Sequence, residues 1–234
     1  MSEVAALKLS DVSVRYEHSR ENAIEQCSLE VRPGQRMALL GLNGAGKTTV
    51  LSIPVGLVPF SGRAEVSGIP VEGKNLAEIR RKVGVLFAVP DDQILFPRVL
   101  DDVMFGLRKR GMERKEAELQ ARKTLELMGI LDLAEASPHR LSHGQKLRVA
   151  LAGALVIEPD LLLLDEPAGA LDPIGQKQLA EHLSTLPTAM LIASHNLPFA
   201  RAACTHYTVI DRGRLQAAPK PITELPANPE ELWH

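Results

Sequence analysis

The sequence has few cysteines and few aromatic residues. Its two cysteines, Cys27 and Cys204, stand far apart, and neither belongs to a Cys-x-x-Cys motif. This argues against a disulfide framework or a zinc knuckle and fits a reducing compartment. Aromatic residues make up only 3% of the chain. A surface that binds single-stranded nucleic acid needs several aromatic platforms for base stacking, so this class of protein is disfavoured.

The chain also lacks a long apolar run and an excess of charge of one sign. No stretch approaches about 18 consecutive apolar residues, and the N-terminus has no basic segment followed by an apolar one, so the sequence predicts neither a membrane span nor a leader peptide. Lys and Arg number 27 against 29 Asp and Glu, a formal net charge of -2. The whole chain therefore offers no electrostatic case for nucleic acid as a partner.

The distribution of apolar residues predicts an α/β fold. Of the 234 residues, 45% are apolar and 24% charged, which suits one compact body with room for a subdomain. The first forty residues alternate short β-like runs with turns and predict antiparallel strands leading into a buried strand. Further buried runs lie at 83–87, 161–164, 189–193 and 207–210. Because these runs alternate with helical segments, we expect a mostly parallel sheet covered by helices.

Between about residues 100 and 156 the pattern becomes helical, which predicts a helical subdomain. Apolar residues there recur at spacings of four, four and three, on one helix face: Ala117, Ala121, Leu125 and Met128. The end of the chain, about 216–234, carries four prolines and predicts an irregular tail.

The most informative motif follows the first buried strand. Residues 41–48 read Gly-Leu-Asn-Gly-Ala-Gly-Lys-Thr and satisfy G-x-x-x-x-G-K-[ST]. Its glycines let backbone N–H groups turn inward around phosphate oxygens, and the helix that follows adds partial positive charge. Lys47 is predicted to reach the β- and γ-phosphates and Thr48 to bind magnesium. The predicted nucleotide contacts of this segment are Asn43, Gly44, Ala45, Gly46, Lys47, Thr48 and Thr49.

Two carboxylates, Asp165 and Glu166, directly follow the apolar run 161–164. Ligand sites of open α/β sheets lie at the carboxyl edge of the strands. Asp165 is therefore expected to support the magnesium ion, and Glu166 to polarise an attacking water as a general base. Since buried strands also end in acidic residues by chance, the pair alone leaves a structural role open. Together with the phosphate-binding motif, the functional interpretation is favoured.

Residues 141–145, Leu-Ser-His-Gly-Gln, precede a predicted helix and lie upstream of the two carboxylates. This segment resembles the LSGGQ signature of ATP-binding cassette (ABC) ATPases, with His143 at its third position. With the other motifs in the same order, the match runs from about residue 7 to 215. The resemblance implies a single ABC ATPase domain over 1–234. Its fold is that of a P-loop NTPase, with a mostly parallel sheet, an antiparallel β subdomain and an inserted helical subdomain.

The resemblance assigns roles to further residues. Tyr16 looks like the aromatic residue that stacks on adenine, residues 168–172 like the D-loop, and His195 like the switch histidine that senses the γ-phosphate. Simpler alternatives stay open, because Tyr16 could be an ordinary strand aromatic and His195 a satisfied histidine at a strand end. The remaining histidines show no metal-ligand spacing and are interpreted as surface or packing residues: His18, His139, His182, His206 and His234.

In this family the signature acts between subunits. Ser142, Gly144 and Gln145 would contact the γ-phosphate of ATP held by a second ABC ATPase subunit, either an identical chain or a paralogue. Two ATP molecules, each with magnesium, are then enclosed in a head-to-tail dimer, and hydrolysis opens it.

Residues 83–107 narrow the resemblance to the energy-coupling-factor importers, and most closely to the ATPases of cobalt and nickel uptake. Such ATPases are peripheral at the cytoplasmic face of the cell membrane and drive integral membrane subunits, which would dock at about residues 88–98. One departure concerns the position after Phe87, where most family members have a glutamine and this chain has Ala88. Gln93 is not an obvious substitute, since related importers have a glutamine there as well.

These observations favour the ATP-hydrolysing subunit of an importer. The alternative is a regulatory ABC subunit that binds ATP with slow or no hydrolysis, because Ala88 has no polar group to offer. An ABC ATPase of DNA repair or translation lacks support, since there is no long coiled-coil insertion, no second cassette and no basic excess.

Overall fold

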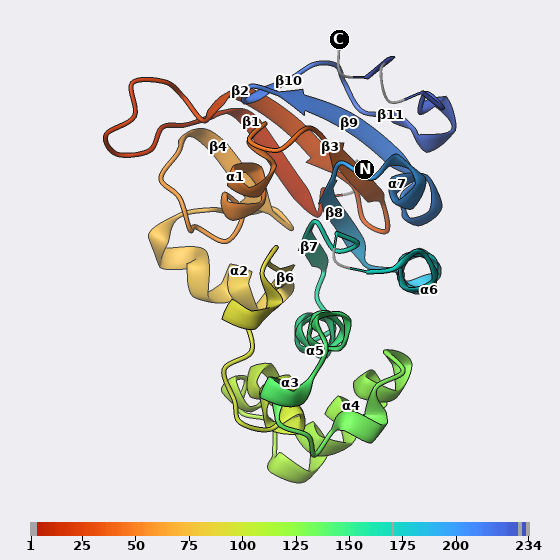
Figure 1. Cartoon of the computed structure of the whole chain (residues 1–234). Coiled ribbons are helices and arrows are strands. Elements are labelled where there is room, and N and C mark those ends of the chain that lie inside the picture. Colours follow the sequence, from red (N-terminus) through yellow and green to blue (C-terminus); the bar gives the residue numbers. More distant parts are fainter. Residues whose placement is uncertain (1–3, 170, 229–230, 233–234) are drawn as a thin grey trace.

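The computed structural model describes residues 4–169, 171–228 and 231–232. One of its two sheets is antiparallel and has the strand order β2-β1-β4-β5 (Figure 1). Its strands are β1 (Leu7–Val14), β2 (Ile24–Val31), β4 (Ser61–Val66) and β5 (Ile69–Pro70). The antiparallel β subdomain expected from the alternating pattern is therefore present.

The second sheet has seven strands and is mostly parallel, as predicted. Its order is β10-β9-β3-β8-β7-β6, with β11 also paired to β9. The parallel strands are β3 (Arg36–Leu40), β6 (Val83–Leu86), β7 (Leu161–Asp165), β8 (Ala189–Ser194) and β9 (His206–Asp211), and the antiparallel ones are β10 (Arg214–Leu215) and β11 (Lys220–Pro221). Every residue of β7 and β8 is buried, which explains their continuous apolar sequences.

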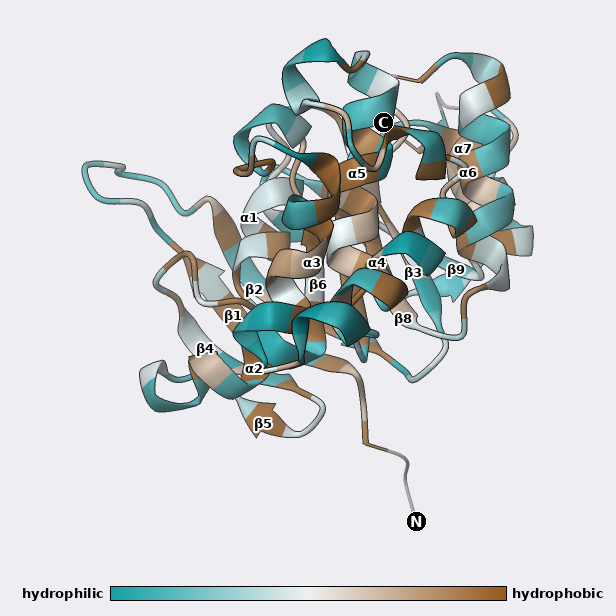
Figure 2. Cartoon of the chain, turned by 90° about the horizontal axis from the view of Figure 1, so that it is seen from below, coloured by the Kyte–Doolittle hydropathy of each residue, from teal (hydrophilic) through white to brown (hydrophobic). Residues whose placement is uncertain are grey.

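Alternate residues of β7 enter two different cores. Leu162 and Leu164 pack among the helices, whereas Leu161 and Leu163 pack toward the antiparallel sheet. A strand exposes successive side chains on opposite faces, so the parallel sheet is a central layer with a hydrophobic core on each side. In Figure 2 the hydrophobic stretches of α5 (His143–Leu155) lie toward the middle of the molecule.

The helices of the described ranges include a group formed by α3, α4 and α5, of which α5 packs against the parallel sheet. Figure 1 shows α3 and α4 at one end of the molecule, with α5 between them and β7. This group spans 99–155, close to the range predicted for a helical subdomain. None of the helices in the described ranges is both long enough and apolar enough to span a membrane. The remaining bounds are α1 (Lys47–Ser52), α2 (Leu76–Lys82), α3 (Val99–Lys109), α4 (Arg114–Leu127), α6 (Pro173–Thr185) and α7 (Leu197–Ala203).

The prediction of an irregular tail over 216–234 was wrong for its first part. Lys220 and Pro221 form β11 along β9, and the hydroxyl of Tyr207 donates to the carbonyl oxygen of Glu224 at 3.2 Å. Leu225 is buried against the core. Proline is tolerated on an edge strand because it needs no N–H partner there, so prolines did not prevent this pairing. Positions 229–230 and 233–234 of the predicted tail, the latter including His234, lie outside the described residues.

Candidate functional site

The phosphate-binding motif lies at the edge of the parallel sheet where β3 and β7 end. Gly41 follows β3, and its N–H donates to the carbonyl oxygen of Ser194 at the end of β8. A pocket of about 490 Å³ opens beside this loop. Its walls are formed by Tyr16, Ala23, Asn43, Gly44, Gly46, Lys47, Thr48, Thr49, Ala88, Asp165 and Glu166. Residues from five separate stretches of sequence therefore meet at one place.

The loop can follow its path only with glycine at two of its positions. A Cβ atom at Gly41 would lie 2.6 Å from the carbonyl oxygen of Ile210, and one at Gly46 would lie 2.7 Å from a side-chain carbon of Ile24. Gly46 also has φ +106°, in the left-handed region. Because these glycines have no Cβ, the backbone can form a concave loop that leads into α1. Such a loop is suited to binding an anion. Helix α1 ends before Pro54, as its sequence predicts.

Lys47 lies at the centre of the pocket and is only 6% exposed. Its ammonium donates to the carbonyl oxygens of Gly41 at 2.7 Å and Leu42 at 3.1 Å. It also lies 3.1 Å from Oε1 of Glu166. A buried ammonium needs such partners, because leaving it unpaired would cost several kcal/mol of solvation. The cation is thereby fixed where the motif predicts a phosphate.

Thr48 and Asp165 are also in contact. The Thr48 hydroxyl donates to Oδ2 of Asp165 at 2.6 Å, and Asp165 is 3% exposed. Burial raises the pKa of Asp165, opposed by the Thr48 hydrogen bond and the charge of Lys47. A hydroxyl beside a carboxylate supplies the oxygen ligands that magnesium prefers, so this pair fits the predicted ion. Within the described residues, no three His, Cys, Asp or Glu side chains form another metal-binding group.

Glu166 lies next to His195. Oε1 of Glu166 is 3.0 Å from Nδ1 of His195, and the Glu166 N–H donates to the carbonyl oxygen of Ala193. Glu166 has φ +48°, a left-handed conformation that is uncommon for a residue other than glycine. This turn directs the carboxylate into the pocket beside Lys47, where a general base is expected.

Tyr16 lies outside β1 and lines the pocket, so it is not an ordinary strand aromatic. Its hydroxyl lies 3.0 Å from Oγ1 of Thr49, and its side chain is partly exposed. Its contact with adenine stays a prediction.

The signature residues lie apart from this pocket. Ser142 is the N-cap of α5: its hydroxyl accepts from the Gln145 N–H at 3.3 Å, and its own N–H donates to Oε1 of Gln145 at 2.9 Å. This capping box fixes the first turn of the helix. None of Ser142, Gly144 and Gln145 is among the residues that line the pocket. The signature residues and the pocket therefore lie at different places on the chain.

The segment expected to be a D-loop joins the two halves. Leu171 packs near Gly144, where an added Cβ would lie 3.1 Å from it, whereas Ala170 lies outside the described residues. Sequence reasoning missed Gln176, whose amide donates to the carbonyl oxygens of Ala168 and Leu171 at 3.1 and 3.0 Å. Its Oε1 accepts from Asn196, which follows His195. The signal available was a glutamine one turn into the helix after the D-loop.

Ala88 lines the pocket, and Gln93 does not replace the missing glutamine there. Oε1 of Gln93 accepts from the Phe87 N–H at 3.1 Å, and its amide donates to the carbonyl oxygen of Val85 at 2.6 Å. Gln93 is thus engaged in bracing the backbone after β6. The pocket wall at Ala88 has no polar side chain to offer a nucleotide.

The loop after Ala88 is tied to the signature helix. Asp91 forms an ion pair with Lys146 of α5, and Nδ1 of His143 lies 3.9 Å from the same carboxylate. The Lys146 hydrogen bond holds the pKa of Asp91 below its ordinary value. Sequence reasoning missed this pair, which joins positions 55 residues apart.

Comparison with known proteins agrees with this geometry. The model of the family described as ABC transporter matches residues 24–169. A protein of Streptomyces coelicolor named as an ABC transporter ATP-binding protein is 40% identical over 91% of this chain and 82% of its own length. One of Methanosarcina mazei is 34% identical over 100% of this chain and 70% of its own length.

Solved structures show the same fold. The structure of cbiO1 from Clostridium perfringens, described as part of the ABC transporter complex cbiONQ, superposes with a TM-score of 0.83 at 31% identity, covering 95% of this chain and 90% of that one. A dimeric ATP-binding cassette bound to ADP and Pi has a TM-score of 0.84 at 25% identity, covering 92% and 98%. The predicted fold is confirmed by these likenesses.

Proposed function

The chain belongs to the ABC transporter family of ATP-binding proteins, and we propose that it binds and hydrolyses ATP to power an importer of the energy-coupling-factor type. The observation that carries this proposal is the chain of contacts from Lys47 to Glu166 to His195 at the ends of parallel strands. A cation for phosphate, a carboxylate base and an imidazole lie within hydrogen-bonding reach of one another.

Each residue of the pocket has a separate task in the proposal. Lys47 binds the β- and γ-phosphates, and because it contacts Glu166 at 3.1 Å, an entering phosphate competes with that carboxylate for the ammonium. Glu166 is then free to take a proton from the attacking water. His195 lies at the Glu166 carboxylate and senses the γ-phosphate. Thr48 and Asp165 would hold magnesium, which when bound neutralises charge on the phosphates.

The proposal requires two kinds of partner. Because Ser142, Gly144 and Gln145 lie outside the pocket, they are available to the nucleotide of a second ABC ATPase chain. Integral membrane subunits would dock at a groove of about 300 Å³ between β6 and α5. Apolar side chains exposed in and around it support such docking: Leu57, Phe87, Val89 and Leu95. The chain would then lie on the cytoplasmic face of the membrane.

A transition-metal ion, cobalt or nickel, is the proposed cargo. The support is the segment 83–107 and the likeness to cbiO1, described as part of the complex cbiONQ. The membrane subunits, not this chain, would carry the ion. Uptake of cobalt and nickel by membranes holding the assembled complex tests the cargo, and uptake of neither would contradict it.

Steady-state ATP hydrolysis with magnesium tests the enzymatic proposal. Wild type is expected to turn over, while Glu166→Gln keeps ATP binding, loses hydrolysis and accumulates as a closed dimer because the base is absent. Glu116→Gln, on the exposed side of α4, is the matched control and should match wild type. A Glu166→Gln protein that hydrolyses ATP at the wild-type rate would refute the assignment.

A regulatory subunit that binds ATP with little hydrolysis is the second candidate. It is favoured by one observation: Ala88 lines the pocket while Gln93 is engaged with Val85 and Phe87. The presence of Glu166 and His195 argues against it. No turnover in wild type and recovery in Ala88→Gln would favour this candidate, whereas turnover in wild type decides for the enzyme.

A further inference from the structure

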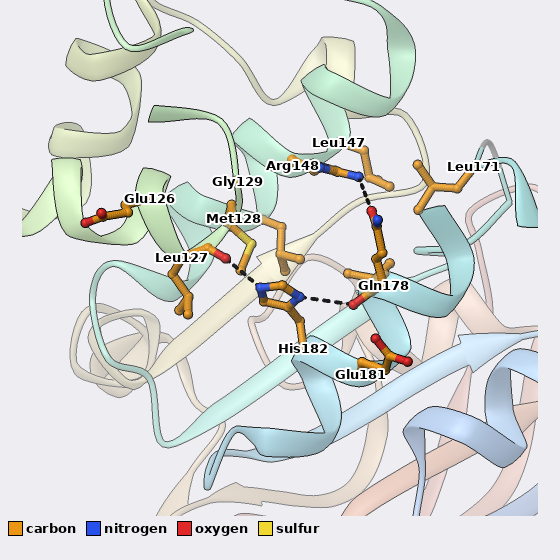
Figure 3. Close-up of a pocket in the computed structure, with 12 residues that line it drawn as sticks. Glu126, Leu127, Met128, Gly129, Leu147, Arg148, Leu171, Gln178, Glu181 and His182 are labelled. Atoms are coloured by element: carbon orange, nitrogen blue, oxygen red, sulfur yellow. Dashed lines mark hydrogen bonds between the residues drawn. The ribbon is translucent and has the colours of Figure 1, made fainter. Parts of the chain in front are cut away.

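A pocket of about 440 Å³ separates the end of α4 and the side of α5 from α6 (Figure 3). We call this region the joint. Apolar side chains line part of it but leave the space unfilled: Leu127, Met128, Leu147, Leu151, Leu171 and Leu179. Polar contacts cross it instead. Arg148 of α5 donates to Oε1 of Gln178 on α6 at 3.0 Å, and His182 of α6 reaches the end of α4.

Both ring nitrogens of His182 face backbone carbonyl oxygens. Nε2 lies 2.6 Å from the carbonyl oxygen of Leu127, and Nδ1 lies 3.0 Å from that of Gln178 (Figure 3). A carbonyl oxygen can only accept, and a neutral imidazole has a single N–H. The neutral ring would therefore set one nitrogen lone pair against a carbonyl oxygen. Both contacts are hydrogen bonds only when His182 carries two protons.

We propose that His182 is a positioning residue whose imidazolium form fastens the helical segment 99–155 to α6. Leu127 is the last residue of α4, so its carbonyl carries the partial negative charge of a helix C-terminus and favours a cation. The charged groups that line the joint are Glu126 of α4, Arg148 of α5 and Glu181 of α6. Of these groups, Arg148 is engaged with Gln178.

The consequence for catalysis rests on the proposed function. Helix α5 carries Ser142, and α6 follows the D-loop, so the joint sets how the signature is presented to a second chain. Histidine loses its second proton between about pH 5 and 8. With two protons on His182 both contacts are hydrogen bonds, and with one proton a single donor remains, so loss of a proton weakens the joint. Losing one hydrogen bond to a charged group shifts the equilibrium between the closed joint and an open one about tenfold or more.

Distance measurement between two spin labels tests the joint without nucleotide. Leu119→Cys on α4 and Ile174→Cys on α6 place labels at exposed positions of the two sides. The native thiols do not compete, because burial raises the pKa of Cys27 to about 11 and of Cys204 to about 12. We expect a narrow distance distribution at pH 6 that broadens at pH 8.5.

Three variants of the labelled protein separate positioning from a general effect of pH. His182→Gln supplies a donor that does not titrate and should give the same distribution at both pH values. His182→Leu supplies none and should be broad at both. His139→Gln removes an exposed histidine of the helical segment and should behave as the parent. A distribution in the parent that does not change with pH, or a change that persists in His182→Gln, would overturn the proposal.

The ATPase rate supplies a second readout. The ratio of the rates at pH 6 and pH 8.5 should differ about tenfold between wild type and His182→Gln. Equal ratios would exclude a role in catalysis. A chain with no ATPase activity at all would instead contradict the proposed function, while the label distances would still decide whether the joint responds to the proton.

Discussion

The two halves of the proposed site are built in different ways. The half around Lys47 lies on strand ends. Lys47 and Asp165 are buried there, and Lys47 contacts Glu166 at 3.1 Å. The half around Ser142 lies at the N-terminus of α5. That helix shares a core with the parallel sheet, and its polar links to other parts of the chain include the Asp91–Lys146 ion pair and the joint. The cation and the carboxylate Asp165 of one half are therefore buried, whereas the polar contacts beside the other half lie nearer the surface.

This difference suits a site completed by two chains. Strand β3 pairs with β8 on one side and β9 on the other, so the loop that follows it has little freedom. The helical segment shares one core with the parallel sheet but meets α6 across an open pocket. A body connected in this way can rotate without breaking the sheet. The half that binds nucleotide would stay fixed while the half offered to a second chain moves.

The largest effect is expected from removing the cation of the half around Lys47. Lys47→Ala should lower ATP affinity a hundredfold or more, because a charge-assisted contact to phosphate is lost. It also leaves Glu166 without its cation. Calorimetric titration with ATP in magnesium checks this. Lys123→Ala, an exposed lysine of α4, is the control. Affinity within threefold of wild type in Lys47→Ala would mean that the buried cation does not face a phosphate.

Substitution at the contact between β6 and α5, which lies between the two halves, should have the next largest effect. A Cβ at Gly84 of β6 would lie 2.4 Å from the carbonyl oxygen of Ala154 on α5. Gly84→Ala should therefore force α5 off the strand and destabilise the fold by about 3 kcal/mol, a fall in melting temperature of roughly 10 °C. Gly153→Ala, in the same helix but with open space beside it, should be neutral or slightly stabilising. Equal melting temperatures for the two variants would show that α5 shifts freely.

The half around Lys47 could be predicted from the sequence. Its phosphate-binding loop is a local motif, and its carboxylates come at the end of a buried strand. Thr48 and Asp165 are 117 residues apart. Thr48 follows the loop after β3 and Asp165 is the last residue of β7, and the carboxyl ends of parallel strands meet at one edge of the sheet. The joint could not be predicted. His182 and Leu127 are 55 residues apart on helices whose mutual position depends on packing, which no periodicity encodes. The pairing of β11 was missed for the same reason.

The pH dependence of stability should have opposite signs in the two halves. Burial raises the pKa of Asp165, so the native state binds more protons than the unfolded state just above the ordinary pKa of aspartate, and stability falls as pH rises there. Arg98 lowers the pKa of Asp101 in the helical segment, so its contribution is present near neutrality and is lost as pH falls through that lowered value.

Isosteric variants measure these two contributions without nucleotide. Asp165→Asn should melt higher than wild type at pH 7, with the gap closing toward pH 4, because the amide can still accept from Thr48. Asp101→Asn should melt lower than wild type at pH 7, with the gap closing in acid. The same sign for both variants would remove the contrast between a buried and a surface half.

The smallest effect is expected for the ion pair that ties the loop after Ala88 to α5. Asp91 and Lys146 meet near the surface, where solvent and side-chain entropy cancel most of the attraction. Asp91→Asn should leave the melting temperature unchanged within error while faster hydrogen exchange appears at residues 90–93. The exchange difference should vanish in high salt, since salt already screens the pair. If Asp91→Asn instead lowered the melting temperature as much as Gly84→Ala, surface contacts would hold the helical segment as firmly as burial holds the nucleotide half, and the segment would have no freedom to move.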